Sequence, residues 1–559
     1  MVENTTRQTD CDVLVVGAGP TGLTAATLLA RRGVRVRIVD ARAEASRESR
    51  AFAIQARTME LFQQIGLVDA FLDRGIINPG IDFFVGGRRV GGFDYDRAAS
   101  PDTPYPFIFL LPQAQTEAIL IEDLVRHGVT VERGVTVTGL DQDVDGVTAL
   151  ANDGSGGTMR IRARYVVGAD GAHSAVRKAL GLAFEGAKYA PTFLLADCRI
   201  TWPADSDLDH DRFRVFLHGD SVALFLPMDG IRCSRVMATD HSGRVEAGGE
   251  AATHLDLPEL ERAFSEASGL AVRLSDPVWT TRYRVHHRGV DHYDRGRAFL
   301  AGDAAHIHSP AGGQGMNTGL QDAANLAWKL AAVVRDGAPA DLLDTYDAER
   351  RPVGRQVVET SDRMFTAVAG QTGWEATIRD WLARPVTAAI SRLDAVQHRA
   401  FRRLGQLEIA YPAGRYVEDG ASGFGPAGPQ VGHRAPNAAL TRDRSLFDLT
   451  TGYGFTVLAM SRKALERDVR HRLLDGLDPL RRDGVAVHLV ARNAVGRDGR
   501  SIAAISPDAF DRYGLRERDG QAIYVIRPDG YVAWRSDGLD IAGCRRFLER
   551  FAPREVAHG

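Results

Sequence analysis

The sequence predicts an α/β protein in which a doubly wound parallel sheet is interrupted by an inserted antiparallel sheet and followed by a smaller α/β domain. Three observations support this fold class. A strand, a glycine turn and a helix open the chain. Short β-rich segments occupy residues 193–285, and a Gly- and Pro-rich stretch at 411–436 precedes a last set of strands.

The first strand–turn–helix unit has the pattern of a Rossmann-like dinucleotide-binding domain. An apolar strand at 11–16 is followed by a G-x-G-x-x-G turn and a helical pattern that stops at Gly33, and the next strand ends at Asp40. These glycines permit the tight turn, the approach of the backbone to a pyrophosphate and close helix–strand packing, while a terminal acid suits a ribose hydroxyl. We expect a bound dinucleotide, NAD or FAD, contacted by Gly17, Gly19, Pro20, Thr21, Gly22 and Asp40.

Two further strand-to-turn segments and a glycine-rich loop extend this site. Residues 165–174 (YVVGADGAHS) and 297–306 (RAFLAGDAAH) each indicate a buried strand that delivers an aspartate, Asp170 or Asp303, to the carboxyl edge of the sheet. Residues 308–319 (HSPAGGQGMNTG) then run into a helical pattern. Glycines let a main chain lie close to a planar ring, and a helix N-terminus favours negative charge there.

In order and approximate spacing, these segments resemble the dinucleotide, DG and GD fingerprints of the single-component (class A) FAD-dependent aromatic hydroxylases, a family that includes phenol hydroxylase and the polyketide hydroxylases. The resemblance implies bound FAD, with Asp303 on the ribityl chain and Asp170 near the pyrophosphate and linked to NAD(P)H use. The catalytic candidates that it implies beside the reacting oxygen are Pro310, Gly312, Gly313 and Arg50. It implies further cofactor contacts from Arg50, Gln113, Gly315, Met316 and Asn317.

The reaction implied by this resemblance is hydroxylation of a phenolic or polycyclic aromatic substrate, including a polyketide, with NAD(P)H and O2 through a flavin C4a-hydroperoxide. NADPH or NADH would bind transiently, because no second strand–glycine turn–helix unit of the dinucleotide type follows. Phenol hydroxylase has an aspartate at the position of Phe52, so the base that would activate a phenol stays unassigned. Baeyer–Villiger insertion on the same scaffold and a non-catalytic FAD-binding protein remain alternatives. A flavin halogenase is disfavoured because its G-W-x-W-x-I-P segment is absent.

The fingerprints are dispersed, so we expect an interrupted FAD-binding domain at 1–185, with a short substrate-side segment at 76–110, that resumes at 285–405. We further expect a substrate-binding β-sheet domain at 186–284, a linker at 406–436 and a thioredoxin-like domain without C-x-x-C at 437–559. Alternation along the inserted strands would gather one set of side chains on a common face. The substrate-pocket candidates are Phe52, Val215, Leu224, Leu226 and Met237.

Composition restricts the partners. A formal net charge of -3 and a pI near 6.6 give no basic footprint for nucleic acid, which favours a small molecule. No metal site is expected, because the four cysteines lack ligand spacing and no third ligand accompanies His306 and His308. The N-terminal stretch has no apolar segment of membrane length, so we expect a cytoplasmic protein without membrane association, whose C-terminal domain serves packing or homodimer formation.

Overall fold

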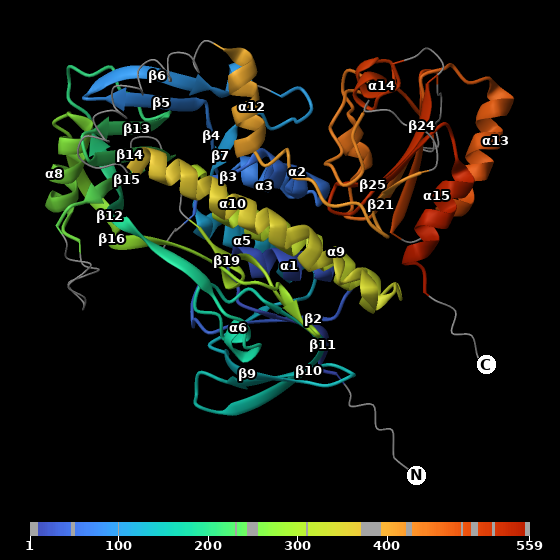
Figure 1. Cartoon of the computed structure of the whole chain (residues 1–559), viewed down its shortest axis with the longest axis horizontal. Coiled ribbons are helices and arrows are strands. Elements are labelled where there is room, and N and C mark those ends of the chain that lie inside the picture. The colour runs from blue at the N-terminus through green and yellow to red at the C-terminus, as the bar shows by residue number, and fades with distance from the viewer. Residues whose placement is uncertain are drawn as a thin grey trace.

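The computed structural model describes residues 9–45, 51–98, 100–229, 232–242, 255–308, 311–369, 393–420, 428–481, 484–493, 501–516 and 520–553. Figure 1 shows three parts: a lower sheet with α1, α5 and α9 above it, a green inserted sheet at the left, and an orange-to-red C-terminal domain at the right. The long helix α10 (Thr345–Ala369) crosses the middle of the molecule.

The lower sheet is parallel at its centre. Five strands in the order β18-β11-β1-β2-β8 run parallel, and the antiparallel strands β17, β10 and β9 extend it. The central strands are apolar and buried, as two-sided coverage of a parallel sheet requires. The strands are β1 (Cys11–Val16), β2 (Val36–Asp40), β8 (Val131–Arg133), β9 (Thr136–Gln142), β10 (Val147–Asn152), β11 (Thr158–Gly168), β17 (Asp294–Arg295) and β18 (Ala298–Leu300).

Helices α1 and α9 pack against each other, and α5 packs against α1. Helix α9 is buried along most of its 21 residues, because small and apolar side chains recur around it. A three-stranded sheet in the order β3-β7-β4 lies beside these helices. The elements of this region are α1 (Pro20–Arg31), β3 (Ala53–Ile54), α2 (Ala56–Gln64), α3 (Val68–Leu72), β4 (Ile76–Asn78), α4 (Tyr95–Ala98), β7 (Ile108–Leu110), α5 (Gln113–Arg126), α6 (Ala175–Ala179), α9 (Gln314–Val334) and α12 (Asp394–Leu404).

The inserted sheet has the order β19-β16-β12-β15-β14-β13-β5-β6. Its centre is antiparallel, as predicted, but β5 pairs with β13 in parallel, which corrects the expectation of a purely antiparallel sheet. The reason is non-local: β5 belongs to the 76–110 segment and joins the edge from far away in the sequence. The elements are β5 (Gly80–Val85), β6 (Arg88–Asp94), β12 (Glu185–Thr201), β13 (Phe213–His218), β14 (Ser221–Asp229), β15 (Cys233–Asp240), α8 (Leu257–Ser268), β16 (Arg273–Gly289) and β19 (His306–Ile307).

The C-terminal domain is built on a six-stranded mixed sheet in the order β20-β25-β24-β21-β22-β23. Strands β21 and β22 are parallel, whereas β21, β24 and β25 form an antiparallel run. The elements are β20 (Glu418–Asp419), β21 (Phe455–Ser461), α13 (Arg467–Leu477), β22 (Val485–Ala491), β23 (Ser501–Ala503), α14 (Asp508–Arg512), β24 (Gln521–Ile526), β25 (Val532–Asp537) and α15 (Ile541–Leu548).

Buried charges join this domain to α9 and α10. Arg527, at the turn after β24, donates to both oxygens of Glu349 at 2.7 and 2.9 Å and also to Asp529. Glu349 accepts in addition from Lys329 Nζ at 2.9 Å and from Asn325 Nδ2 at 2.7 Å. All five side chains are buried. Because an unpaired buried charge is costly, this network fixes the position of the domain.

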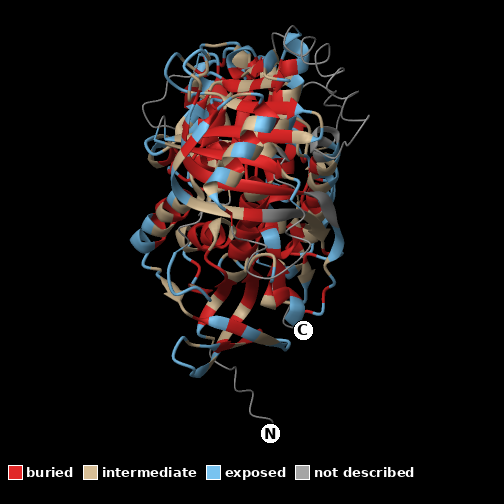
Figure 2. Cartoon of the chain, turned by 90° about the vertical axis from the view of Figure 1, so that its left-hand side faces the viewer, coloured by how far each residue is buried: buried red, intermediate tan, exposed pale blue. Residues whose placement is uncertain are grey.

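A second buried network lies beside the first. Arg57 of α2 donates to the backbone oxygen of Asp529 and to Glu60. Arg434 donates to the same Glu60 and to Asp102, so α2 is held between two parts of the C-terminal region. Figure 2 shows buried residues running through the sheets, while exposed residues lie on outer helices, loops and the outer strands. Within the described residues, every helix falls short of the length and apolarity needed to cross a membrane.

We predict that Glu349→Gln lowers the free energy of unfolding by about 3–5 kcal/mol, because it removes the buried carboxylate that Lys329 and Arg527 share and leaves Asp529 as the remaining carboxylate of the network. Burial acts to raise the pKa of Glu349, but Arg527 and Lys329 hold it at about 2, below its ordinary 4.5. The contribution of the carboxylate is therefore present above pH 4.5 and is lost as pH falls towards 2. Urea unfolding at pH 7 and at lower pH measures this.

Glu359→Gln is the matched control, because Glu359 lies on the same helix in an exposed pair with Arg363. Its effect should stay within about 0.5 kcal/mol. Equal effects of the two substitutions would contradict a docking role for the buried network.

Candidate functional site

The three predicted turns meet at one edge of the parallel sheet. Register pairs Val16 with Gly168 and Gly168 with Leu300, so β1, β11 and β18 end side by side. The backbone continues this alignment beyond the strands, since Ala169 N–H donates to Val16 O at 2.8 Å and Ala301 N–H donates to Gly168 O at 3.0 Å. The glycine turn, the DG turn and the GD turn therefore share one carboxyl edge, where doubly wound sheets bind ligands.

The glycine turn fits a dinucleotide. A Cβ on Gly22 would overlap the backbone oxygen of Gly17, and one on Gly17, whose φ is +102°, would overlap the backbone of Ala169. A Cβ on Gly19 or Gly171, in contrast, would meet nothing within 4 Å. Gly17 and Gly22 are thus required by packing. Gly19 adjoins open space at the N-terminus of α1, where a pyrophosphate can approach the backbone.

Thr21 lies at the contact between α1, the GD turn and α9. Its side chain occupies the space that a Cβ on Gly302 or Gly319 would need. Pro20 is one of the first residues of α1, where its missing N–H costs no helical hydrogen bond. These small residues let the two helices and the turn approach closely. The geometry of the cofactor edge therefore depends on helix packing as well as on the strands.

Asp40 ends β2 and is buried. Its carboxylate accepts from Ala18 N–H at 2.6 Å and from Arg42 N–H at 2.9 Å, and Arg133 lies 3.6 Å away. Burial acts to raise the pKa of Asp40, but the hydrogen bonds from Arg42 and Ala18 hold it below its ordinary value. The group is ionised at neutral pH and can accept a hydrogen bond from a hydroxyl group.

The two motif aspartates have different surroundings. Asp170 accepts from Ser174 Oγ at 2.5 Å and from the N–H groups of Ala175 and Val176 at 2.6 and 3.1 Å, so its carboxylate binds the first turn of α6. Burial raises the pKa of Asp170 in spite of these hydrogen bonds. Asp303 is exposed on the open side of the GD turn, where a ligand can reach it.

Arg177 is a residue whose role the sequence reasoning missed. Its Nη1 donates to Ala304 O at 2.9 Å and its Nη2 donates to Ala172 O at 2.8 Å. Its guanidinium carbon also lies 3.9 Å from the ring centroid of Phe184. Arg177 therefore holds the DG turn against the GD turn. The feature of the sequence that could have indicated this role is the position of Arg177 in the short helix directly after the DG turn.

The glycine-rich loop precedes α9 and is fastened to β3. Gly312 and Gly313 have φ of +78° and +62°, a region that favours glycine. Asn317 Nδ2 donates to Gly313 O and to Ala53 O, both at 2.8 Å, and its Oδ1 accepts from Gln55 N–H. The predicted cofactor contact Asn317 thus uses its side chain to hold the loop.

The remaining cofactor candidates lie around this loop. Gly315 adjoins the ring of His308, and Met316 packs against the main core. Gln113, at the start of α5, accepts from Ala51 N–H at 3.3 Å and donates to Glu117 at 2.8 Å. Arg50 and Pro310, two of the catalytic candidates, lie outside the described residues.

Gln55 was not predicted but adjoins the same loop. Its Nε2 donates to Gly312 O at 2.9 Å, while its buried Oε1 has no hydrogen-bond partner among the residues that the structure describes. An unsatisfied buried acceptor beside the loop is a place where a ligand donor would be stabilised. With the open space at Gly19, this orphaned acceptor is a further observation that fits a bound flavin cofactor.

Because successive side chains of a strand point to opposite sides, the inserted sheet has two different faces. One face packs against α8, with Phe216 and Phe225 contacting Phe264 and Leu260 in one cluster. The opposite face carries the predicted pocket residues in another cluster. Its members include Val215, Leu226 and Met237, with Leu224 and Phe52 packed against them. The structure therefore brings all five candidates together on the face away from α8.

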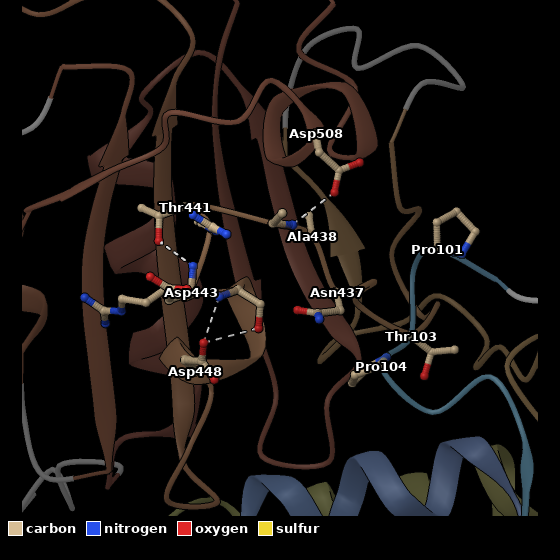
Figure 3. Close-up of a pocket in the computed structure, with 13 residues that line it drawn as sticks. Pro101, Thr103, Pro104, Asn437, Ala438, Thr441, Asp443, Asp448 and Asp508 are labelled. Atoms are coloured by element: carbon tan, nitrogen blue, oxygen red, sulfur yellow. Dashed lines mark hydrogen bonds between the residues drawn. The ribbon is translucent and has the colours of Figure 1, made fainter.

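A hollow of about 420 Å³ lies elsewhere, between the 101–104 loop and the C-terminal domain (Figure 3). Its acidic residues serve local turns: Asp448 accepts from Ser445 N–H at 2.7 Å and Asp508 accepts from Ala439 N–H at 3.0 Å. None of the predicted site residues lines it. It is therefore separate from the cofactor edge.

The fold and this edge define a dinucleotide-binding α/β protein whose inserted sheet has an apolar face directed away from α8. Residues 10–361 match the FAD binding domain family, and residues 428–553 match the family described as aromatic-ring hydroxylase, C-terminal. The chain belongs to the class A FAD-binding aromatic-ring hydroxylases and is a FAD-dependent aromatic monooxygenase.

Known relatives extend over nearly the whole chain. The 6-methylpretetramide 4-monooxygenase of Streptomyces rimosus is 37% identical, over 98% of this chain and 95% of the relative. The pentachlorophenol 4-monooxygenase of Sphingobium chlorophenolicum is 34% identical, over 95% and 94%. Aklavinone-11 hydroxylase, solved as a ternary complex with FAD and aklavinone, matches with a TM-score of 0.75 and 26% identity, over 98% of this chain and all of that one.

Two glycine substitutions should separate folding from cofactor binding. We predict that Gly19→Ala leaves the melting temperature of the apoprotein unchanged but raises the Kd for FAD at least tenfold, about 1.4 kcal/mol, because the methyl group enters the open space. Gly22→Ala should lower the melting temperature of the apoprotein itself, because its Cβ overlaps Gly17.

Titration of each apoprotein with FAD, followed by flavin fluorescence, and thermal unfolding without FAD measure the two effects. Tight FAD binding by the Gly19→Ala variant would show that the pyrophosphate does not lie against this turn.

Proposed function

We propose that this monooxygenase hydroxylates a phenolic or polycyclic aromatic substrate, such as a polyketide, between the inserted sheet and the glycine-rich loop. The observation that carries the proposal is the position of Phe52. It packs into the apolar cluster of the inserted sheet, and the next residue, Ala53, accepts a hydrogen bond from Asn317 beside the loop. Two consecutive residues of the chain therefore contact the apolar face and the helix that follows the candidate flavin loop. The relatives are named as monooxygenases of 6-methylpretetramide and of pentachlorophenol.

The proposed cofactor contacts follow from the site geometry. The α1 N-terminus at Gly19 would hold the pyrophosphate, Asp40 a ribose hydroxyl and Asp303 the ribityl chain. Asp170 would act through the turn that it stabilises, because three donors already occupy its carboxylate. Gln113, Gly315, Met316 and Arg50 remain proposed cofactor contacts, and Arg50 and Pro310 remain proposed catalytic residues. When bound, FAD would supply hydride acceptance from NAD(P)H and activation of O2 for transfer of one oxygen atom.

The protein's own contribution would be orientation and exclusion of water. The backbone of Gly312 and Gly313 would face the reacting oxygen, held by Gln55 and Asn317. The apolar cluster around Met237 would keep the aromatic ring dry, since water allows unproductive release of hydrogen peroxide. NADPH or NADH would bind only transiently. No second dinucleotide turn set between a strand and a helix is present in the sequence.

We also propose a structural rather than redox role for the C-terminal domain, with a thioredoxin-like arrangement. The parallel pair β21–β22 and the antiparallel run β21–β24–β25 support this arrangement. Cys544 is buried in this domain and unpaired, and C-x-x-C is absent from the sequence. The four free cysteines suit a reducing cytoplasm.

The test is consumption of NADPH and O2 by the FAD-loaded protein with a panel of simple phenols and hydroxyquinones. We expect at least one substrate to stimulate NADPH oxidation and to yield a product heavier by one oxygen atom. The structure of that product distinguishes ring hydroxylation from Baeyer–Villiger insertion. FAD retention without stimulation by any simple or polycyclic aromatic would contradict the proposed substrate class.

A further inference from the structure

Helix α12 ends in a turn in which a glutamine takes the place usually held by glycine. Gln406 N–H donates to Arg403 O at 3.2 Å. Leu407 N–H donates to Arg402 O at 2.9 Å, which completes the Schellman pattern of a helix C-terminus. Gln406 has φ of +58°, a left-handed conformation that glycine adopts without steric cost and that strains a residue with a Cβ. Its side chain is nevertheless enclosed by the protein, because Gln406 is only 3% exposed.

The amide of Gln406 belongs to a chain of buried side-chain amides. Gln321 Nε2 donates to Gln406 Oε1. Gln406 Nε2 donates in turn to Gln314 Oε1 at 2.6 Å. Gln314 Nε2 donates to Gly312 O at 2.9 Å and to Leu404 O at 3.0 Å. The chain therefore runs from α9 through the end of α12 to a carbonyl group of the glycine-rich loop.

Two backbone carbonyl groups fix the direction of this chain. A carbonyl oxygen only accepts, so the atom of Gln314 that faces Gly312 and Leu404 is the amide nitrogen. The side-chain oxygen of Gln314 then faces Gln406 and needs a donor there, which the Gln406 amide supplies. A carboxylate or an apolar side chain at position 406 has no such donor. Gln406 therefore determines how Gln314 is held.

The Gly312 carbonyl is the point at which the chain reaches the candidate flavin loop. It accepts from Gln314 Nε2 and from Gln55 Nε2, both at 2.9 Å, so both lone pairs of the oxygen are engaged. Glycine at position 406 would end α12 with less strain, so the helix itself gives no reason for a glutamine. A strained residue that is held in place beside a candidate site points to a role in that site.

Helix α12 also connects this turn with the inserted sheet. Gln397 Oε1 accepts at 3.3 Å from the N–H of Asp94, which ends the edge strand β6. Arg402 Nη1 donates to Asp102 at 2.6 Å. The turn at Gln406 therefore lies between the glycine-rich loop and the helix that contacts the edge of the inserted sheet.

We propose that Gln406 is a positioning residue of this monooxygenase, which acts through Gln314 on the Gly312 carbonyl and so holds the glycine-rich loop where it stabilises reduced FAD. The inference rests on the proposed position of the flavin beside this loop. Reduced flavin carries a negative charge, which the N-terminus of α9 directly after the loop would stabilise. Displacement of the loop would therefore weaken the binding of reduced FAD more than that of oxidised FAD.

The test is the midpoint potential of the bound flavin, which needs no substrate. We expect Gln406→Gly to bind oxidised FAD within threefold of the wild-type Kd. Its preference for reduced over oxidised FAD should fall at least tenfold, about 30 mV for a two-electron couple. The variant should fold, because glycine relieves the strain at this turn.

A double-variant cycle tests whether Gln406 acts through Gln314. Gln314→Ala should lower the potential by a similar amount, because it removes the next link of the chain. The double variant should lower it no further than either single variant, since both substitutions break the same connection. Additive effects would assign independent structural roles to the two glutamines and would overturn the inference.

Two further variants calibrate the measurement. Gln64→Met is the matched control, because Gln64 of α2 is a buried glutamine whose Oε1 has no hydrogen-bond partner among the described residues; its potential should stay at the wild-type value. Gly313→Ala displaces the loop directly, because Gly313 has φ of +62° and its Cβ would lie 2.8 Å from Ala53 Cβ. It should lower the potential.

An unchanged potential in Gln406→Gly would overturn the inference. If Gly313→Ala lowers the potential in the same series, the proposed position of the flavin stands without it. If Gly313→Ala also leaves the potential unchanged, the flavin does not lie beside the loop, and that part of the proposed function fails too. Failure to find an aromatic substrate in the NADPH assay bears on the proposed function alone, because no measurement here requires turnover.

Discussion

The carboxylate of Asp322 is the constraint on which the cofactor edge depends. It is fully buried in α9 and lies 2.6 Å from His306 Nε2, while it accepts from Gly302 N–H at 3.1 Å and from Arg350 Nε at 2.7 Å. Burial acts to raise the pKa of Asp322, but Arg350 and His306 hold it below its ordinary value. One ionised group thus fixes the GD turn, the strand leading to the glycine-rich loop, and α10.

This arrangement has a second half outside the flavin-binding residues. Arg350 also donates to Thr318 O and to the hydroxyl of Tyr411, whose ring stacks near Tyr531. Arg527 lies 4.9 Å from the ring centroid of Tyr411 and binds Glu349, the neighbour of Arg350. Residues of the C-terminal domain therefore contact the same helix turn that holds Asp322. These contacts are consistent with the structural role proposed for the domain, in which it supports the cofactor edge through packing and charge.

Much of the cofactor edge was predictable because its determinants are local. The spacing of Gly17, Gly19 and Gly22 predicts a tight turn, and the structure shows a steric requirement for glycine at Gly17 and Gly22. The sequence likewise indicated which pocket residues share a face, since alternation in a strand has period two. It could not say which face packs against a helix. That assignment depends on α8, whose Phe264 contacts Phe216 from outside the strands.

The features that escaped prediction are non-local. A charged residue in an amphipathic helix, such as Arg57 or Glu60, is usually exposed, yet both are buried here because the C-terminal turn covers them. The parallel pairing of β5 with β13 joins residues far apart in sequence. The hydrogen bonds from α6 to the carboxylate of Asp170 are local, but only coordinates reveal which nearby donors a turn aspartate meets.

The buried link between Arg527 and Glu349 has a consequence for recombination among related enzymes. A chimera that exchanges only the C-terminal domain would bring a foreign turn to Glu349, Lys329 and Asn325, all of which remain with the first domain. Any mismatch in charge there would leave an ion buried without its partner. Exchange of the inserted sheet should therefore disturb folding less, because its face away from α8 is mainly apolar. An exchanged C-terminal domain would instead need matching residues at Glu349, Lys329 and Asn325.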